Sequence, residues 1–301
     1  MNFNEIIGNQ EVKSYLDSSI KNNTITHSYM FSGVSGIGKC ILAKEFARKI
    51  LCHEEGQDEC TCKSCTLFRE NSSPDFSIID ENGKTIKIEI IRKLIEKVIE
   101  KPIFSKRKVY IINDFENMTK EAQNCLLKTL EEPPEFATII LITSDENKIL
   151  TTIKSRCTIV KFAQLSNQEI KEYASKYLNE SIKEEMIEYC GGSIGKTIEV
   201  LEHRDIYENI SKAFENIQGK SIKSFWDDCK IIYDKENIFN LLDFLIVLFY
   251  SKSKDEIKYL YCIDVINEAF KRLKVNTNFE MSIDNMLLKI WEAFNEKSNR
   301  C

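Results

Sequence analysis

The segment GVSGIGKC, residues 33–40, constrains the fold of this chain more than any other feature of the sequence. It matches the phosphate-binding loop G-x-x-x-x-G-K-[ST] except at its last position, which is Cys40. The apolar segment SYMFS precedes it, and apolar residues at helical spacing follow it. A strand, a glycine turn and a helix in this order surround an anion with backbone amides and a helix N-terminus. The sequence therefore predicts an α/β domain with a phosphate site at the end of a strand.

The candidate nucleotide-binding residues of the loop are Gly33, Gly36, Gly38, Lys39 and Cys40. The glycines let the backbone approach phosphate closely, and Lys39 is expected to reach the β- and γ-phosphates. Cys40 replaces a hydroxyl that helps to hold Mg²⁺, and a neutral thiol is a poor ligand for this hard cation. The loop thus favours phosphate-loop ancestry and argues against Mg²⁺-dependent ATP catalysis. An ordinary glycine turn is the simpler alternative.

The acidic partner of such a loop is expected at the end of the apolar strand VYII, residues 109–112. In phosphate-loop enzymes of this kind an Asp there holds the metal, and the Glu that follows it activates water. This chain has Asn113, which is neutral, and Asp114, which is shorter than a glutamate. If Asp114 takes the metal-holding place, the water-activating place falls to Phe115. A strand end with a polar cap is the alternative, and either interpretation leaves the acidic pair incomplete.

Strands and helices alternate up to about residue 165. Several of the apolar segments are short and apolar on both faces, which is typical of a parallel sheet covered by helices on both sides. The expected strands are 28–33, 75–80, 108–114, 137–143 and 157–162, and the expected helices include 121–132 and 146–155.

The character of the sequence changes at Ser166. Ser166 and Glu169 form a helix-capping pattern, and every later periodic segment has helical spacing. We therefore expect an α/β domain at residues 1–165, a small helical domain at 166–205 and a larger helical domain at 206–301.

Four of the eleven cysteines cluster between a helix and a strand of the α/β domain. Cys52, Cys60, Cys62 and Cys65 form the pattern C-x7-C-x-C-x2-C, which suits a tetrahedral Zn²⁺ site with structural function. Four unrelated reduced cysteines are the alternative, and His53 is a possible substitute ligand. The remaining cysteines fall mostly on apolar faces and are expected to be small core residues.

Composition limits the remaining classes of function. The net charge is -5, so no overall basic character points to nucleic acid. The N-terminus lacks the apolar core of a signal peptide, and the apolar stretch 238–250 is too short to span a membrane. Clustered cysteines without a secretion signal indicate a reducing compartment, so a cytoplasmic protein is expected.

Four segments together closely resemble the clamp-loader subunits of bacterial DNA polymerase III. They are THSYMFSGVSGIGK, the cysteine segment, CLLKTLEEPPEFATIILIT and IKSRC. Within this family the delta-prime type is the most similar. The resemblance implies an α/β P-loop (AAA+) domain with a parallel sheet, a helical lid and an all-α collar domain that closes a five-subunit ring.

The resemblance also implies a role for Arg156. In this family the arginine of S-R-C projects into the ATP site of the neighbouring subunit, where Arg156 would neutralise charge developing on the γ-phosphate. A surface or helix-capping arginine is the alternative. The family's motor subunits carry a sensing arginine where this chain has Gly195, and whether Lys196 compensates is open.

The departures at Cys40, Asn113, Asp114 and Gly195 favour a non-catalytic, delta-prime-like subunit that helps to load the sliding clamp onto primed DNA. The implied partners are the gamma/tau motor subunits, the delta subunit, the sliding clamp and DNA contacted through the assembled complex, with no membrane. An active gamma/tau-like ATPase is the main alternative. A zinc-knuckle nucleic-acid binder is disfavoured, since the chain is mildly acidic.

Overall fold

The structure, a computed structural model, describes residue 3 and residues 6–54, 60–215, 217–254, 256–275 and 278–295. The chain divides into two compact units. The first comprises Met1–Glu169 and Ser193–Gly195, and the second comprises Ile170–Gly192 and Lys196–Cys301. The finer division of the helical part at residue 205 stays a prediction.

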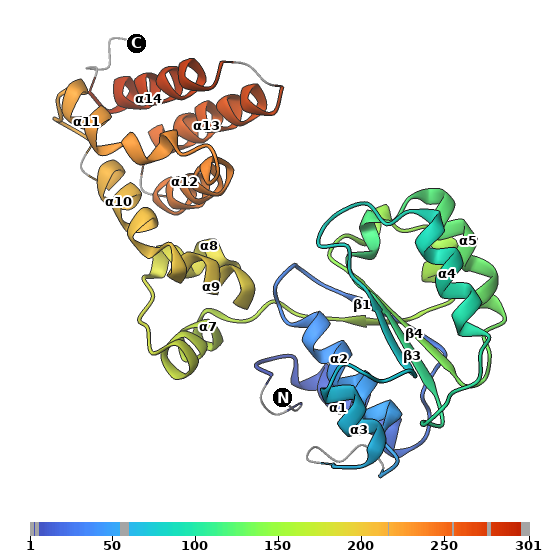
Figure 1. The fold of residues 1–301 in the computed structure, drawn as a ribbon. Helices are drawn as coiled ribbons and strands as arrows, with labels where there is room; N and C mark the ends of the chain where they lie inside the picture. Colours follow the sequence, from blue (N-terminus) through green and yellow to red (C-terminus); the bar gives the residue numbers. More distant parts are fainter. Residues whose placement is uncertain are drawn as a thin grey trace. The chain divides into compact units, whose positions relative to one another are not determined.

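A five-stranded parallel sheet forms the centre of the first unit (Figure 1), as the sequence predicts. The strand order is β2-β3-β4-β1-β5, so β1 lies between β4 and β5. The strands are β1 (Ser28–Ser32), β2 (Phe76–Ile79), β3 (Lys108–Ile112), β4 (Ala137–Thr143) and β5 (Thr158–Lys161). Every residue of β1, β3 and β4 is buried, which explains why these strands read as continuous apolar runs.

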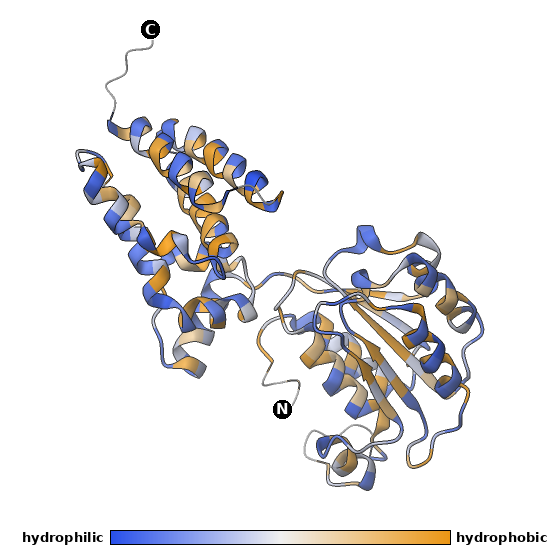
Figure 2. Cartoon of the chain, turned by 45° about the horizontal axis from the view of Figure 1, so that its top comes forward, coloured by the Kyte–Doolittle hydropathy of each residue, from blue (hydrophilic) through white to orange (hydrophobic). Residues whose placement is uncertain are grey.

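Side chains of successive strand residues enter two separate cores, one on each face of the sheet. Tyr29 and Phe31 pack into one core, whereas Met30 packs into the other. Helices α1 (Gln10–Lys21), α2 (Lys39–Leu51) and α3 (Lys63–Arg69) cover the first face, and α4 (Ile88–Val98) and α5 (Lys120–Glu131) cover the second (Figure 1). Figure 2 shows the corresponding pattern, with hydrophobic strands between helices that carry hydrophilic residues.

The predicted helix at 146–155 is wrong in its middle. The segment forms a short 3₁₀ helix η2 (Glu146–Lys148) and a single helical turn α6 (Thr151–Lys154), separated by extended residues. The buried side chain of Gln123 replaces the helical hydrogen bonds there. Its Nε2 donates to the carbonyl of Lys148 at 3.2 Å, and its Oε1 accepts from the amide of Leu150 at 3.0 Å.

The second unit is helical throughout its described elements, as predicted. It contains α7 (Asn167–Tyr173) from Ile170 onward, a π-helical turn η3 (Ala174–Leu178), α8 (Glu184–Cys190), α9 (Ile194–Glu202) from Lys196 onward, α10 (Arg204–Glu215), α11 (Ile222–Asp228), η4 (Lys230–Tyr233), α12 (Ile238–Lys252), α13 (Lys258–Lys274) and α14 (Phe279–Asn295). Helix α12 packs at the centre of this unit, which accounts for its apolar sequence. Among the described helices, none is both long enough and apolar enough to cross a membrane.

The predicted cap at Ser166 is present. The amide of Glu169 donates to Ser166 Oγ, and the amide of Ser166 donates to Glu169 Oε2. This reciprocal pair satisfies two backbone donors at the start of α7.

Candidate functional site

The glycine loop lies where the parallel strands end, at their shared carboxyl edge. Gly38 has a φ of 91° and caps the N-terminus of α2. Gly36 has a φ of 75° and meets the backbone of Gly195, whose amide donates to the Gly36 carbonyl at 2.9 Å. A side chain at position 195 would approach the Gly36 Cα at 3.1 Å, so this backbone contact favours glycine at both positions.

Lys39 is turned toward its own loop. Its Nζ donates to the carbonyl of Gly33 at 2.6 Å and to the carbonyl of Val34 at 2.7 Å, and its side chain is buried. Burial lowers the pKa of Lys39, and the charges of Glu116 and Asp114 oppose this effect. Lys39 thus places a cation against the loop backbone and next to the N-terminus of α2, and both features favour an anion.

Cys40 is partly buried and packs against the core that contains α2. Burial raises the pKa of the Cys40 thiol, so the neutral form is favoured. A neutral, packed thiol does not supply the oxygen ligand that Mg²⁺ prefers. The residues present therefore fit phosphate better than they fit Mg²⁺.

Asn113 and Asp114 follow β3, as the sequence predicts. The Nδ2 of Asn113 donates to Asp80 Oδ2 at 3.2 Å, which ties the end of β3 to the end of β2. Asp114 has a φ of 47°, and burial, followed by the charges of Glu116 and Asp80, raises its pKa. Phe115 is fully buried, so its side chain belongs to the core and not to the site.

Glu116 is a carboxylate of this edge that the sequence analysis missed. After the left-handed residue Asp114, the turn η1 (Phe115–Asn117) directs Glu116 toward the end of β4, where Glu116 Oε1 accepts hydrogen bonds from the amide and the hydroxyl of Ser144. Burial raises its pKa, but these hydrogen bonds outweigh burial and lower the pKa overall. The sequence feature that could have identified Glu116 is its position, two residues after Asp114 and close to the end of β3.

Arg156 lies between α6 and β5, on the opposite side of β1 from the ends of β2 and β3 in the strand order. Its side chain is 32% exposed and pairs with Glu131 at the end of α5. Its Nη1 donates to the carbonyl of Thr152 at 2.7 Å, and its own carbonyl accepts from Ser28 Oγ at 2.6 Å. Arg156 is thus a surface cation with a defined orientation.

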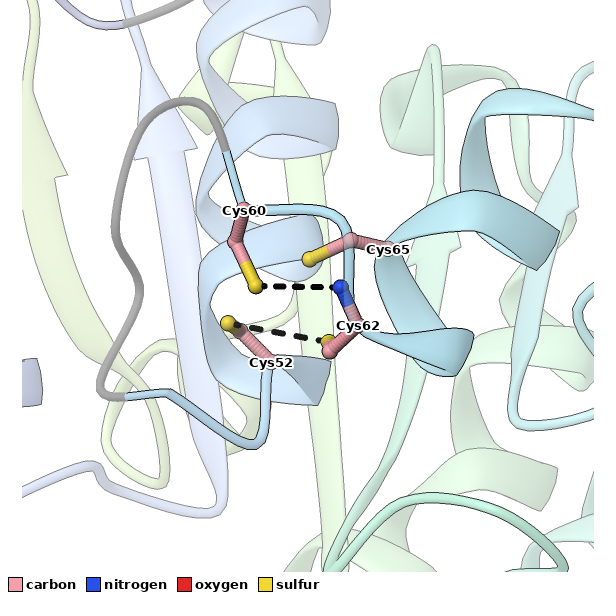
Figure 3. A group of neighbouring side chains, drawn as sticks. All are labelled: Cys52, Cys60, Cys62 and Cys65. Atoms are coloured by element: carbon pink, nitrogen blue, oxygen red, sulfur yellow. Dashed lines mark hydrogen bonds between the residues drawn. The ribbon is translucent and has the colours of Figure 1, made fainter.

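The four predicted cysteine ligands lie together (Figure 3). Their Sγ atoms are all within 4.8 Å of one another, and those of Cys52 and Cys62 are 4.0 Å apart. Tetrahedral Zn²⁺ with Zn–S bonds near 2.3 Å separates sulfur atoms by roughly 3.8 Å, which is close to this arrangement. The cluster can therefore bind a metal ion that prefers sulfur. His53 is not among the grouped ligands of the described residues.

Backbone and side-chain donors surround these sulfur atoms. Arg48 Nη1 donates to Cys65 Sγ at 3.3 Å, and a buried Glu45 holds the guanidinium through a 2.6 Å ion pair. The amide of Cys62 donates to Cys60 Sγ at 3.3 Å. Burial raises the pKa of Cys62, but the amides of His53 and Cys65, together with hydrogen bonds from other cysteines, outweigh this effect and lower it to about 6. At Cys60 and Cys65 burial outweighs the hydrogen bonds and raises the pKa, at Cys65 to about 11, so of these three thiols only Cys62 favours the thiolate before a metal binds. The same donors are suited to orient the sulfur atoms toward a metal.

Lys196 lies over the ring of Tyr189, with its Nζ 3.6 Å from the ring centroid. Both residues belong to the second unit. Burial lowers the pKa of Lys196, and the charge of Asp243 opposes this effect. Lys196 therefore takes part in the internal packing of the helical unit.

The fold and the loop define the class of protein. The chain resembles the crystal structure of a DNA polymerase III gamma subunit-related protein from Thermotoga maritima, with a TM-score of 0.52, 18% identity, and coverage of 92% of this chain and 99% of that one. This likeness concerns the fold. Together with the parallel sheet and the helical second unit, it confirms the predicted α/β P-loop (AAA+) fold class.

The family follows from the sequence itself. Residues 8–166 match the family model described as "DNA polymerase III, delta subunit", and the chain belongs to this family. It is 33% identical to DNA polymerase III subunit tau/gamma of Haemophilus influenzae over 180 residues, which are 59% of this chain and 26% of that protein. It is 34% identical to DNA polymerase III subunit delta' of Bacillus subtilis over 162 residues, which are 54% of this chain and 49% of that protein.

A third relative, DNA polymerase III subunit gamma of Buchnera aphidicola, is 33% identical over 211 residues, which are 67% of this chain and 58% of that protein. The chain thus spans less than two thirds of the length of these relatives. The relatives carry both gamma/tau and delta' names, so the similarity supports the family and does not separate these two types.

The position of Glu116 predicts a pH-dependent contribution to stability. Its pKa is lowered in the folded state, so its charge stabilises the fold above its ordinary pKa of 4.5, and this contribution is lost as the pH falls through the lowered value. Glu116→Gln keeps an oxygen acceptor for Ser144 and removes the charge. We expect the variant to be less stable than the parent at pH 7 and this difference to shrink below pH 4.5. Amide hydrogen exchange in β3 and β4 measures the difference in stability between the parent and the variant. A difference that stays constant from pH 7 to below pH 4.5 would contradict the stabilising role of the Glu116 charge.

Proposed function

We propose that the chain is a non-catalytic, delta-prime-like subunit of the DNA polymerase III clamp loader, acting in the cytoplasm. In this role it joins the gamma/tau motor subunits and the delta subunit in a complex that loads the sliding clamp onto primed DNA. Its own contribution to catalysis is Arg156, supplied to the ATP site of a neighbouring subunit. Its own nucleotide site is a retained scaffold.

The observation that carries this proposal is the contrast between the two candidate sites. At the glycine loop, Cys40 is a packed thiol, Asn113 is neutral, and Gly195 makes a backbone contact that favours a residue without a side chain. Arg156, in contrast, is partly exposed, permanently charged and held in place. A subunit with this pair of properties is suited to stabilise charge on a nucleotide bound elsewhere.

One observation favours the second candidate, an active gamma/tau-like ATPase. The charges of Glu116 and Asp114 act on Lys39, so carboxylates are present at the loop despite the substitution at Asn113. The relatives named gamma/tau are consistent with this candidate. It requires that these carboxylates compensate for Cys40 and Asn113 in holding Mg²⁺.

The cysteine cluster is proposed to bind structural Zn²⁺. The four cysteines supply a complete tetrahedral set, so no position is left for a reacting water. Arg48 is suited to offset part of the negative charge of four thiolates through its contact with Cys65. The metal would join the end of α2 to the start of α3, and it would take no part in ATP chemistry.

The Arg156 assignment predicts a loss of hydrolysis in the assembled complex. Arg156→Ala should reduce turnover at the site it completes on the order of 10³-fold, the lower range for fingers supplied in trans. The measurement is steady-state ATP hydrolysis by the complex reconstituted with its motor and delta subunits. Arg92→Ala, which removes an exposed arginine of α4, is the matched control. Unchanged turnover with Arg156→Ala would refute the finger assignment.

Nucleotide binding separates the two candidate functions. Calorimetry of the isolated chain with ATP or ADP should give no binding, or weak binding that is the same with Mg²⁺ present and with Mg²⁺ chelated. The reason is that Cys40 and Asn113 do not hold Mg²⁺. Tight, Mg²⁺-dependent binding would favour the active ATPase instead.

The zinc proposal predicts one bound metal ion per chain under reducing conditions. Cobalt substitution should give the absorption of sulfur-to-cobalt charge transfer, and Cys62→Ser should weaken metal binding at least tenfold. Cys125→Ser, in α5 outside the cluster, should retain the metal. Fluorescence of Trp226 and Trp291, both in the second unit, should not change when a chelator removes the ion. A purified chain that takes up neither zinc nor cobalt would exclude the site.

A further inference from the structure

We propose that Glu131 is a positioning residue for Arg156, holding its guanidinium in the orientation in which it meets the neighbour's nucleotide. This inference rests on the proposed function, because it assigns a role within the same site. Glu131 is the last residue of α5 and was not singled out in the sequence. Its carboxylate and the Arg156 guanidinium form a direct ion pair.

Two different kinds of contact fix the guanidinium. Nη2 donates to Glu131 Oε1, and Nη1 donates to the Thr152 carbonyl at 2.7 Å and to Ser155 Oγ at 3.4 Å. Among the described residues, Nε of Arg156 has no hydrogen-bond partner. Because a guanidinium carries five N–H donors in a planar fork, this arrangement orients the group and leaves donors available to a phosphate.

The groups that hold Arg156 are themselves anchored. Leu130, beside Glu131, is 1% exposed, and Ile153, beside Thr152, is fully buried. Gln123 of α5 is hydrogen-bonded to the backbone on both sides of the break before α6. Glu131 and Thr152 therefore lie on two elements that are tied to one another, and their spacing is fixed by the core.

A role in stability does not explain this pair. The side chains of Arg156 and Glu131 are 32% and 47% exposed, and ion pairs at such exposure contribute little to folding. Ordering the Arg156 side chain before it meets the neighbour's nucleotide is expected to raise the rate of hydrolysis. The side chain then loses less conformational entropy when the catalytic complex forms. The expected gain is about three- to tenfold in turnover.

The test uses the reconstituted complex with four variants of this chain: Glu131→Ala, Glu131→Gln, Arg156→Ala, and Glu131→Ala combined with Arg156→Ala. Glu131→Ala should lower kcat about three- to tenfold and leave the KM for ATP unchanged, because the neighbour binds the ATP. Glu131→Gln should restore most of the rate, since its amide oxygen accepts the same hydrogen bond. The double variant should match Arg156→Ala alone, because Glu131 acts only through Arg156. Glu132→Ala, which removes the adjacent exposed carboxylate, is the control and should behave as the parent.

The remaining outcomes test the positioning role of Glu131 separately from the finger role of Arg156. If Arg156→Ala lowers turnover and Glu131→Ala does not, or if Glu131→Ala raises turnover, the positioning role is overturned and the finger stands. A double variant slower than Arg156→Ala alone would show that Glu131 acts by another route, which also overturns it. If Arg156→Ala has no effect, the proposed function fails, and the role of Glu131 fails with it.

Discussion

Burial of both faces of the parallel sheet is the constraint on which the candidate sites depend. Tyr29 and Phe31 enter one core while Met30 enters the other, so helices must cover both sides. Parallel strands covered in this way bring their carboxyl ends to one edge, where the glycine loop, Asn113 and Glu116 meet. The same packing fixes α5 against α6 and so sets the distance between Glu131 and Arg156.

The centre of the sheet was predictable because β1, β3 and β4 are buried on both faces and therefore stand out as apolar runs. The break in the helix at 146–155 was not, because Gln123 causes it from a distance in sequence. A buried amide that satisfies Lys148 and Leu150 removes the need for helical hydrogen bonds there. Periodicity alone cannot detect a tertiary contact of this kind.

The candidate site was predictable where a motif fixes the backbone, and less so where a turn decides the direction of a side chain. The four cysteines come together as their spacing predicted. Glu116 was missed because the left-handed residue Asp114 changes the course of the chain after β3. As a result, the carboxylate of Glu116, three residues after Asn113, faces Ser144. Glu131 was missed because its significance depends on a partner that is distant in sequence.

The substitutions at the glycine loop are linked by their physical environments. Cys40 contributes apolar surface to the core behind the loop, which a more polar hydroxyl would do less well. Gly195 brings its amide to the Gly36 carbonyl at a separation that leaves little space for a side chain. Asn113 pairs with Asp80, a contact in which a second carboxylate would be repelled. Cys40, Gly195 and Asn113 thus each make a contact within the folded chain, and these contacts support the proposal that the loop is retained for its structure.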